Sequence, residues 1–129
     1  MAFGRQTTAA LVKPLEGAIV RRFTAGATIE AGEVVSLMAD GYVDPTNTAA
    51  FTGSLVVGVA LAGAAAGERV DVVTYGPVTA LIDATPAALI YGTDTDGEPG
   101  TTVGTKDVIV GFAEAATVLF VRPRMIDLF

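Results

Sequence analysis

Apolar residues in this chain fall into short runs separated by turns rich in glycine and aspartate. After a start without clear periodicity, a β pattern begins with GAIVRRF at residues 17–23. Similar runs follow at residues 34–38 and 77–83, and two more lie within residues 107–123. Short strands at fairly regular spacing with glycine-rich turns are typical of barrels and sandwiches. The pattern therefore predicts a small all-β, single-domain β-barrel or β-sandwich with an extended N-terminal arm.

Two Asp-Gly pairs mark predicted hairpin tips, at residues 40–41 and at residues 96–97. Asp-Gly between apolar runs favours a type I′ turn, because that turn needs positive φ at both central residues. We expect Asp-Pro at residues 44–45 to end the strand that returns from the first hairpin. We expect Pro-Gly at residues 99–100 to form a further turn.

A weak internal repeat relates residues 31–43 to residues 66–78. Both copies have the form A-G-E-x-V-x(5)-G-x-V, at an offset of 35 positions. In each copy we expect a Gly-Glu turn to lead into a strand, and Gly41 or Gly76 to start the return. Residues 62–67 are then a tight connection between strands, with a single helical turn as the alternative.

Two predicted strands near the end of the chain are apolar on both faces. In residues 108–112, Val108, Val110 and Phe112 are expected to share one face, yet the intervening positions are not polar either. A half-exposed strand would alternate apolar and polar residues. The second face is therefore expected to be covered, either by a loop of the same chain or by another subunit.

The chain is expected to divide into an extended arm at residues 1–16, the β domain at residues 17–123 and a tail at residues 124–129. The arm lacks apolar periodicity, and Pro14 cannot donate a hydrogen bond to a strand ladder. We expect the arm to lie against a neighbouring chain. Pro123 is expected to end the last strand.

The composition removes several classes of function. The 129 residues include no Cys, His or Trp, which excludes disulfides, thiol nucleophiles, histidine bases and most zinc sites. The net charge of −6 does not favour nucleic acid, whose phosphates need a basic footprint. Although 51% of residues are hydrophobic, no run reaches the roughly 20 residues of a membrane span, and no signal peptide is expected. The hydrophobic side chains are therefore expected to be buried in the domain or against partners.

Few residues suggest chemistry. The sequence DTDGE at residues 94–98 is similar to a calcium loop, but its twelfth position is Thr105 instead of glutamate, so a plain hairpin turn is favoured. Glu33, Glu68 and Asp71 could supply paired carboxylates for glycoside hydrolysis, but both glutamates follow turn glycines and are expected in solvent. We therefore expect no enzyme activity, no catalytic residues, no cofactor and no metal site.

The sequence also resembles a known family, the small head decoration, or cement, proteins of tailed bacteriophages. The shared features begin with V-G-V-A at residues 57–60, G-E-x-V-x-V at residues 67–72 and a G-x-V return at residues 76–78. They continue with the D-G hairpin at residues 96–97 and V-G-x-A at residues 110–113.

The resemblance covers roughly residues 17–123. It implies a β-barrel-like domain on the outside of an icosahedral capsid in the virion, commonly as trimers. The implied partner is the major capsid protein, whose lattice the chain would stabilise by bridging neighbouring subunits, without nucleic acid or membrane. Arginine is enriched at interfaces, and most basic residues lie near the two ends of the chain. Candidate contact residues for capsid or subunit are Phe3, Arg5, Leu11, Lys13, Arg21, Arg22, Arg122, Arg124, Ile126 and Phe129.

Two other functions stay open at this stage. One is another structural virion component, such as a tail-tube or head-completion protein of similar β architecture. The other is a soluble β-sandwich module that binds a sugar or small ligand. Such a module would usually expose aromatic residues, of which the chain has three Tyr and six Phe.

Overall fold

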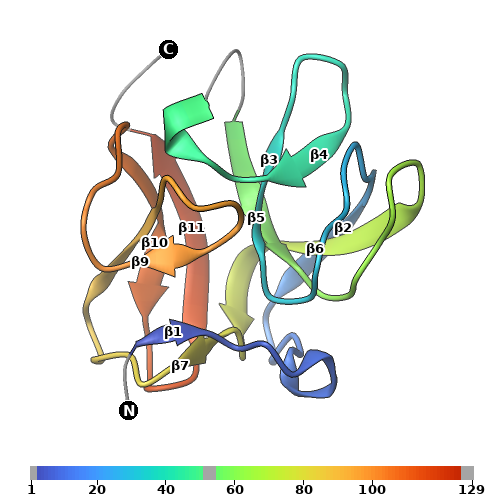
Figure 1. The fold of residues 1–129 in the computed structure, drawn as a ribbon. Helices are drawn as coiled ribbons and strands as arrows, with labels where there is room; N and C mark the ends of the chain where they lie inside the picture. Colours follow the sequence, from blue (N-terminus) through green and yellow to red (C-terminus); the bar gives the residue numbers. More distant parts are fainter. Residues whose placement is uncertain (1–2, 51–54, 126–129) are drawn as a thin grey trace.

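The computed structural model describes residues 3–50 and 55–125. These residues form eleven β-strands and two short 3-10 helices, and contain no α-helix (Figure 1). The prediction of an all-β fold is therefore confirmed. Within the same residues, no helix is long and apolar enough to cross a membrane.

Most strands are built from valine, isoleucine and leucine, whose side chains pack well on a pleated surface. The strands are β1 (Gly4–Arg5), β2 (Ile19–Thr24), β3 (Val34–Leu37), β4 (Val43–Pro45), β5 (Leu55–Ala60), β6 (Arg69–Val78), β7 (Leu81–Ile82), β8 (Leu89–Gly92), β9 (Pro99–Gly100), β10 (Val108–Ala113) and β11 (Leu119–Met125). The 3-10 helices are η1 (Ala9–Leu11) and η2 (Thr48–Ala50).

Nine strands form one antiparallel sheet in the order β4-β3-β5-β6-β11-β10-β8-β9, and β2 pairs with β6 outside this path. Strands β1 and β7 form a separate two-stranded sheet (Figure 1). The large sheet curls until the β8–β9 loop meets the segment after β4. There Gly97 N donates to Thr46 O (2.8 Å) and Thr48 N donates to Thr93 O (2.9 Å). The fold is thus a half-barrel whose ends are joined by loop hydrogen bonds.

The core lies on both sides of β3, β5 and β6. Val34 and Val73 belong to the larger hydrophobic cluster, whereas their neighbours Val35 and Val72 belong to a second one. Loops of the same chain cover the second cluster, with Ile29 fully buried in it. The strands covered on both faces are therefore central strands of the sheet, beneath loops.

Within the described residues, the core covers only one face of β10 and β11. Cover of the other face by another subunit stays a prediction. The register of β10 shifts between Ile109 and Gly111. Val108 and Val110 are buried in the core, but Phe112 is half-buried on the outer face, where it stacks on Phe120. The prediction that all three side chains share one face is wrong, because a bulge inserts a residue and reverses the alternation beyond it.

Pro123 does not end the last strand, because β11 continues to Met125. Between the pairs Gly111↔Val121 and Ile109↔Arg124, β11 contains one residue more than β10. Pro123 lies in this irregularity, beyond the residues of β11 that pair with β6. A bulge is one of the few places where a sheet accepts proline.

The first Asp-Gly pair forms a hairpin turn between β3 and β4, as predicted. Gly41 N donates to Met38 O (2.9 Å), and Met38 N donates to Tyr42 O (2.8 Å). Gly41 has a φ of 87°, but Asp40 does not have positive φ. The turn is therefore a type I turn followed by a left-handed glycine, not the expected type I′ turn. The second pair lies in the β8–β9 hairpin loop, where Gly97 has a φ of 71°.

The two copies of the internal repeat differ in structure. Gly41 lies in a turn, whereas Gly76 lies inside β6 with a φ of 105°. Residues 69–75 pair with β2 and residues 76–78 pair with β11, so Gly76 lies where β6 changes partners. Residues 62–67 connect β5 to β6 without a helical turn, as predicted.

Two local predictions are wrong. The expected strand at residues 77–83 is divided between the end of β6 and the short strand β7, because Ala80 N donates to Val78 O and turns the chain. Residues 99–100 form β9 and pair with β8, so they are not a turn.

Candidate interaction surfaces

The N-terminal segment, predicted to lie against a neighbouring chain, packs on its own chain. Strand β1 pairs with β7. Helix η1 follows, so the segment is not extended throughout. Val12 is buried in the larger core cluster, and Phe3 packs against the same cluster. Contact of this segment with a second chain stays a prediction.

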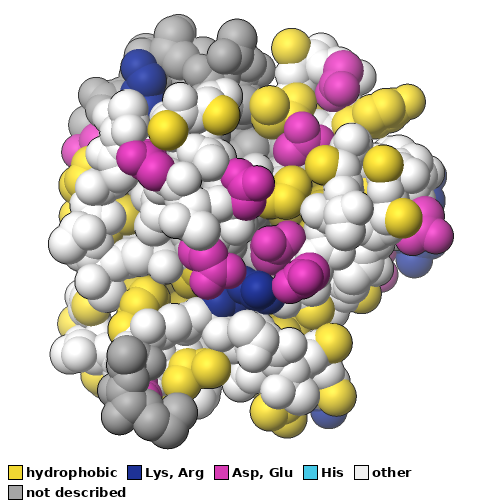
Figure 2. Space-filling model, viewed as in Figure 1, with side chains coloured by type: hydrophobic (Ala, Val, Ile, Leu, Met, Phe, Trp, Pro, Cys, Tyr) yellow, Lys and Arg dark blue, Asp and Glu magenta, His cyan; other side chains and the backbone are white. Residues whose placement is uncertain are grey.

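Arg5 holds this segment to the sheet. Its Nε donates to Glu98 Oε2 (2.6 Å), its Nη2 to Glu30 Oε1 (3.1 Å) and its Nη1 to the carbonyl of Ala31 (2.8 Å). Burial lowers the pKa of Arg5, but the hydrogen bonds to Glu98 and Glu30 and the charges of Glu98 and Glu33 more than offset this, so the pKa is raised. Figure 2 shows acidic side chains around a basic group near the middle of one face. Arg5, a predicted contact residue, thus forms ion pairs with carboxylates of its own chain.

Glu33 lies beside this group, and the expectation that it faces solvent is wrong. It is only 8% exposed, and its Oε1 accepts a hydrogen bond from Glu30 N (2.8 Å). Burial raises the pKa of Glu33 above its usual value. Glu68, by contrast, is exposed and accepts a hydrogen bond from Ala65 N (2.7 Å). Asp71 forms an ion pair with Arg22, so the three carboxylates are held in separate local contacts.

A first candidate surface consists of residues 11–20, most of which are exposed, together with β2, and is here called the N-terminal edge. Nine large apolar side chains are exposed in the described part of the chain, and four of them lie in this run. They are Leu11 (54% exposed), Leu15 (41%), Ile19 (53%) and Val20 (40%). Such a concentration of apolar side chains marks an interaction surface more strongly than scattered ones do.

The N-terminal edge also carries several sequence-predicted residues. Leu11, Lys13, Arg21 and Arg22 are all exposed along it. Arg22 Nε donates to Asp71 Oδ1 (2.9 Å), a bond that lowers the pKa of Asp71. Among the described strands, β2 pairs only with β6, so its other edge has backbone groups that are open to a partner strand.

A second candidate surface is a row of side chains on the outer face of the sheet, here called the aromatic stripe: Leu89, Phe112, Phe120 and Tyr75. Leu89 pairs across strands with Phe112. The rings of Phe112 and Phe120 stack with centroids 5.1 Å apart, and Tyr75 meets Phe120 edge to face at 5.3 Å. Sequence reasoning missed this stripe because it placed Phe112 on the same face as Val108 and Val110.

A groove of about 310 Å³ adjoins the stripe. It is lined by Leu89, Ile109, Gly111, Phe112, Arg122, Pro123 and Arg124. The structure thus brings two predicted residues, Arg122 and Arg124, to the same groove as the stripe. The predicted residues Ile126 and Phe129 lie outside the described residues.

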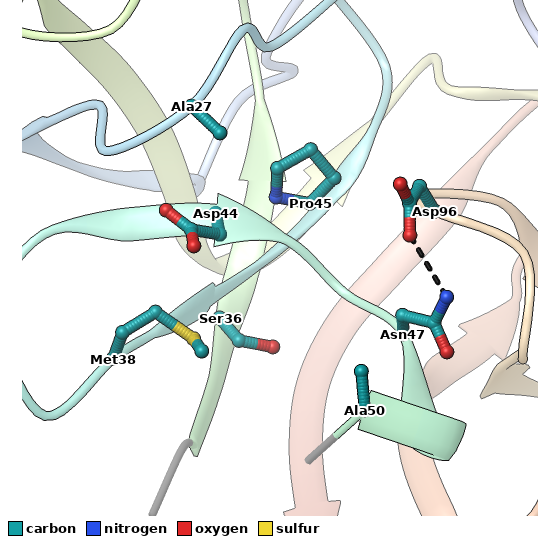
Figure 3. Close-up of a pocket in the computed structure, with 8 residues that line it drawn as sticks. All are labelled: Ala27, Ser36, Met38, Asp44, Pro45, Asn47, Ala50 and Asp96. Atoms are coloured by element: carbon teal, nitrogen blue, oxygen red, sulfur yellow. Dashed lines mark hydrogen bonds between the residues drawn. The ribbon is translucent and has the colours of Figure 1, made fainter. Parts of the chain in front are cut away.

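A smaller pocket of about 200 Å³ lies between β4, β3 and the β8–β9 loop (Figure 3). Asp44 and Asp96 both line it, and Asn47 Nδ2 donates to Asp96 Oδ1 (2.8 Å). Burial raises the pKa of Asp44, whose Oδ1 is buried and has no hydrogen-bond partner among the described residues. In the described part of the chain, no group of three or more His, Cys, Asp or Glu side chains is placed to hold a metal ion.

The segment similar to a calcium loop is tied down by hydrogen bonds. Asp94 accepts hydrogen bonds from Thr105 N (2.9 Å), from Thr105 Oγ1 (2.6 Å) and from the hydroxyl of Thr48. The bond from the Thr105 hydroxyl, followed by that from Thr48, lowers the pKa of Asp94. Asp94 therefore joins two loops of the half-barrel.

Comparison of the sequence with models of known protein families and with curated proteins finds no match to this chain. The resemblance to phage head decoration proteins therefore rests on the sequence pattern alone.

Proposed function

We propose that this chain is a capsid decoration protein. It binds the outside of a phage head, in contact with the major capsid protein, and stabilises the lattice by bridging neighbouring subunits. In this role the chain is a structural protein of the virion and not an enzyme, and it needs no cofactor. The sequence pattern at residues 57–78 and 96–113 supports the proposal, as does the all-β fold.

The observation that carries the proposal is the N-terminal edge. It combines exposed apolar side chains with the positive charges of Lys13 and Arg21 beside an open strand edge. An extended segment of a capsid subunit can add to such an edge through backbone hydrogen bonds. The apolar side chains then supply buried area, and the charges set the register.

The bound chain stabilises the shell by mass action. A protein that binds the assembled lattice better than the expanded or broken lattice shifts the equilibrium toward the assembled form. This role needs contact area and a rigid body, which the curled sheet and its two core clusters provide.

The proposal predicts that the purified chain co-sediments with shells of the major capsid protein of the encoding phage. The double variant Leu11→Ser/Val20→Ser should bind at least about tenfold more weakly, because it removes apolar contact area. The matched control is Leu55→Ser/Val103→Ser, which changes side chains of similar exposure (52% and 49%) outside the edge. Its binding should equal that of the wild type.

Shells without the chain should also rupture at a lower temperature and under milder osmotic shock than decorated shells. A wild-type chain that does not sediment with the shells would overturn the proposed function. Equal rupture of bare and decorated shells would overturn the stabilising role.

A further inference from the structure

The aromatic stripe leaves large apolar side chains on an outer sheet face. Leu89 and Tyr75 are 47% and 46% exposed, and the two stacked phenylalanines between them are half-buried. The stripe crosses β8, β10, β11 and β6, with Phe120 paired opposite Pro77. A contiguous apolar row of this kind marks a surface that packs against a partner.

Opposite charges lie on the two sides of the stripe, along the direction of the strands. Glu114 lies at the turn of the β10–β11 hairpin and is exposed. Arg122 and Arg124 lie toward the other end of β11, where they line the groove beside Leu89. Within the part of the chain that the structure describes, none of these three charged groups forms an ion pair.

The spacing of these charges is self-complementary. Glu114 follows Phe112 by two residues, and Arg122 follows Phe120 by two residues. At about 3.3 Å per residue Arg122 lies about 7 Å along β11 from the aromatic pair, and Glu114 lies one residue past the end of β10, up to about 7 Å from that pair. Because β10 and β11 are antiparallel, the two charges lie in opposite directions from that pair.

A two-fold axis can use this arrangement. Let two copies stack with their outer sheet faces together, and let the axis lie between the two sheets, perpendicular to the strands and level with the phenylalanines. A rotation of 180° about this axis then places Glu114 of one copy opposite Arg122 of the other. The symmetry makes this contact twice, as in an isologous interface, where one patch meets itself. The stacked rings of both copies then form the centre of the interface, with the charged pairs at its rim.

We infer that the aromatic stripe is a self-association surface through which two copies of this chain pack face to face. The occupant is a second copy, because the patch itself contains both the acid and the base that the pairing needs. The stripe borders the N-terminal edge, because Tyr75 pairs across strands with Ile19. The association of two copies is measured on the isolated chain, so the inference does not depend on capsid binding.

The test is the dimer dissociation constant, measured by sedimentation velocity over a concentration series. The wild type should form a dimer. Glu114→Arg and Arg122→Glu should each weaken it by about tenfold or more, because each variant sets two like-charged contacts across the two-fold axis. The double variant Glu114→Arg/Arg122→Glu restores opposite charges and should return the constant to within about threefold of the wild type. Leu89→Ser should also weaken the dimer.

The controls are Arg69→Glu and Leu55→Ser, which change exposed side chains outside the stripe and should leave the constant unchanged. Circular dichroism of each variant verifies that the fold is kept. The inference is overturned by a wild type that stays monomeric up to about 1 mM, by a trimer mass, or by a double variant that fails to restore the dimer.

Discussion

Arg5 joins three parts of the chain that are distant in sequence. A planar guanidinium presents five N–H groups in a fixed fork, so one side chain can serve several acceptors. Here it serves Glu98, Glu30 and the carbonyl of Ala31 while its side chain is only 8% exposed. Arg5 thus adds to the β1–β7 pairing and the buried Val12 in holding the N-terminal segment to the body of the protein.

Arg5→Met should release this segment. Methionine retains much of the apolar stem but donates no hydrogen bond, so the Ala31 carbonyl and the Glu98 carboxylate lose their donor. We expect the free energy of unfolding to fall by about 2 kcal/mol. Hydrogen exchange should become faster in residues 4–12 but not in β10 or β11. Arg5→Lys is the matched control and should recover only part of the loss, because an ammonium group lacks the fork. Unchanged protection of residues 4–12 in Arg5→Met would contradict this role.

At the scale of elements, two glycines allow strands to approach more closely than side chains permit. A Cβ on Gly58 in β5 would lie 1.8 Å from the carbonyl oxygen of Val73 in β6. A Cβ on Gly111 in β10 would lie 1.9 Å from the carbonyl oxygen of Phe120 in β11. Backbone atoms form both contacts, so no side-chain rotation can relieve the clash.

Gly58→Ala is therefore expected to be severe, with a loss of about 3 kcal/mol or more in the free energy of unfolding. Gly63→Ala is the matched control, since its Cβ would meet only Ile29 O at 3.4 Å and its backbone φ is not positive. Its effect should stay within about 1 kcal/mol. Urea denaturation of both variants measures the difference. Equal losses in the two variants would show that close approach at Gly58 is not the cause.

The elements also show what the sequence could predict and what it could not. The hairpins at Gly41 and Gly97 were predicted because turn chemistry is local. The bulges near Gly111 and Pro123 were not, because they depend on the residue count of the partner strand. The error at Gly111 also hid the aromatic stripe, since it placed Phe112 on the same face as Val108 and Val110.

The residues of the candidate surfaces likewise include some that the sequence could predict and some that it could not. Leu11, Lys13 and Arg21 were predicted from their place near the start of the chain, and the structure gathers them along one edge. The role of Arg5 was missed, because its partner Glu98 lies 93 positions away. No local pattern in the sequence connects those two residues.

At the scale of the whole molecule, four carboxylates form two pairs with opposite responses to acid. Burial raises the pKa of Glu33 and of Asp44. Hydrogen bonds from Thr105 and from Arg22 lower the pKa of Asp94 and of Asp71, respectively. A carboxylate with a raised folded pKa destabilises the fold when ionised, and this cost disappears as the pH falls through that pKa. A carboxylate with a lowered pKa stabilises the fold above its ordinary pKa, and this gain is lost as the pH falls further.

We therefore predict that the melting temperature rises on mild acidification from pH 7 toward about pH 5 and falls below about pH 4. Protonation also reduces the net charge of −6, which weakens self-repulsion in the folded state.

Glu33→Gln distinguishes the two causes of the rise, which are the buried carboxylate and the net charge. Glutamine keeps an oxygen acceptor for Glu30 N but carries no charge, so this variant should melt above the wild type at pH 7 and rise less on acidification. Asp94→Asn should flatten only the fall below about pH 4. Calorimetry from pH 3 to pH 7 measures all three curves. Parallel curves for wild type and Glu33→Gln would assign the rise to net charge and not to the buried carboxylate.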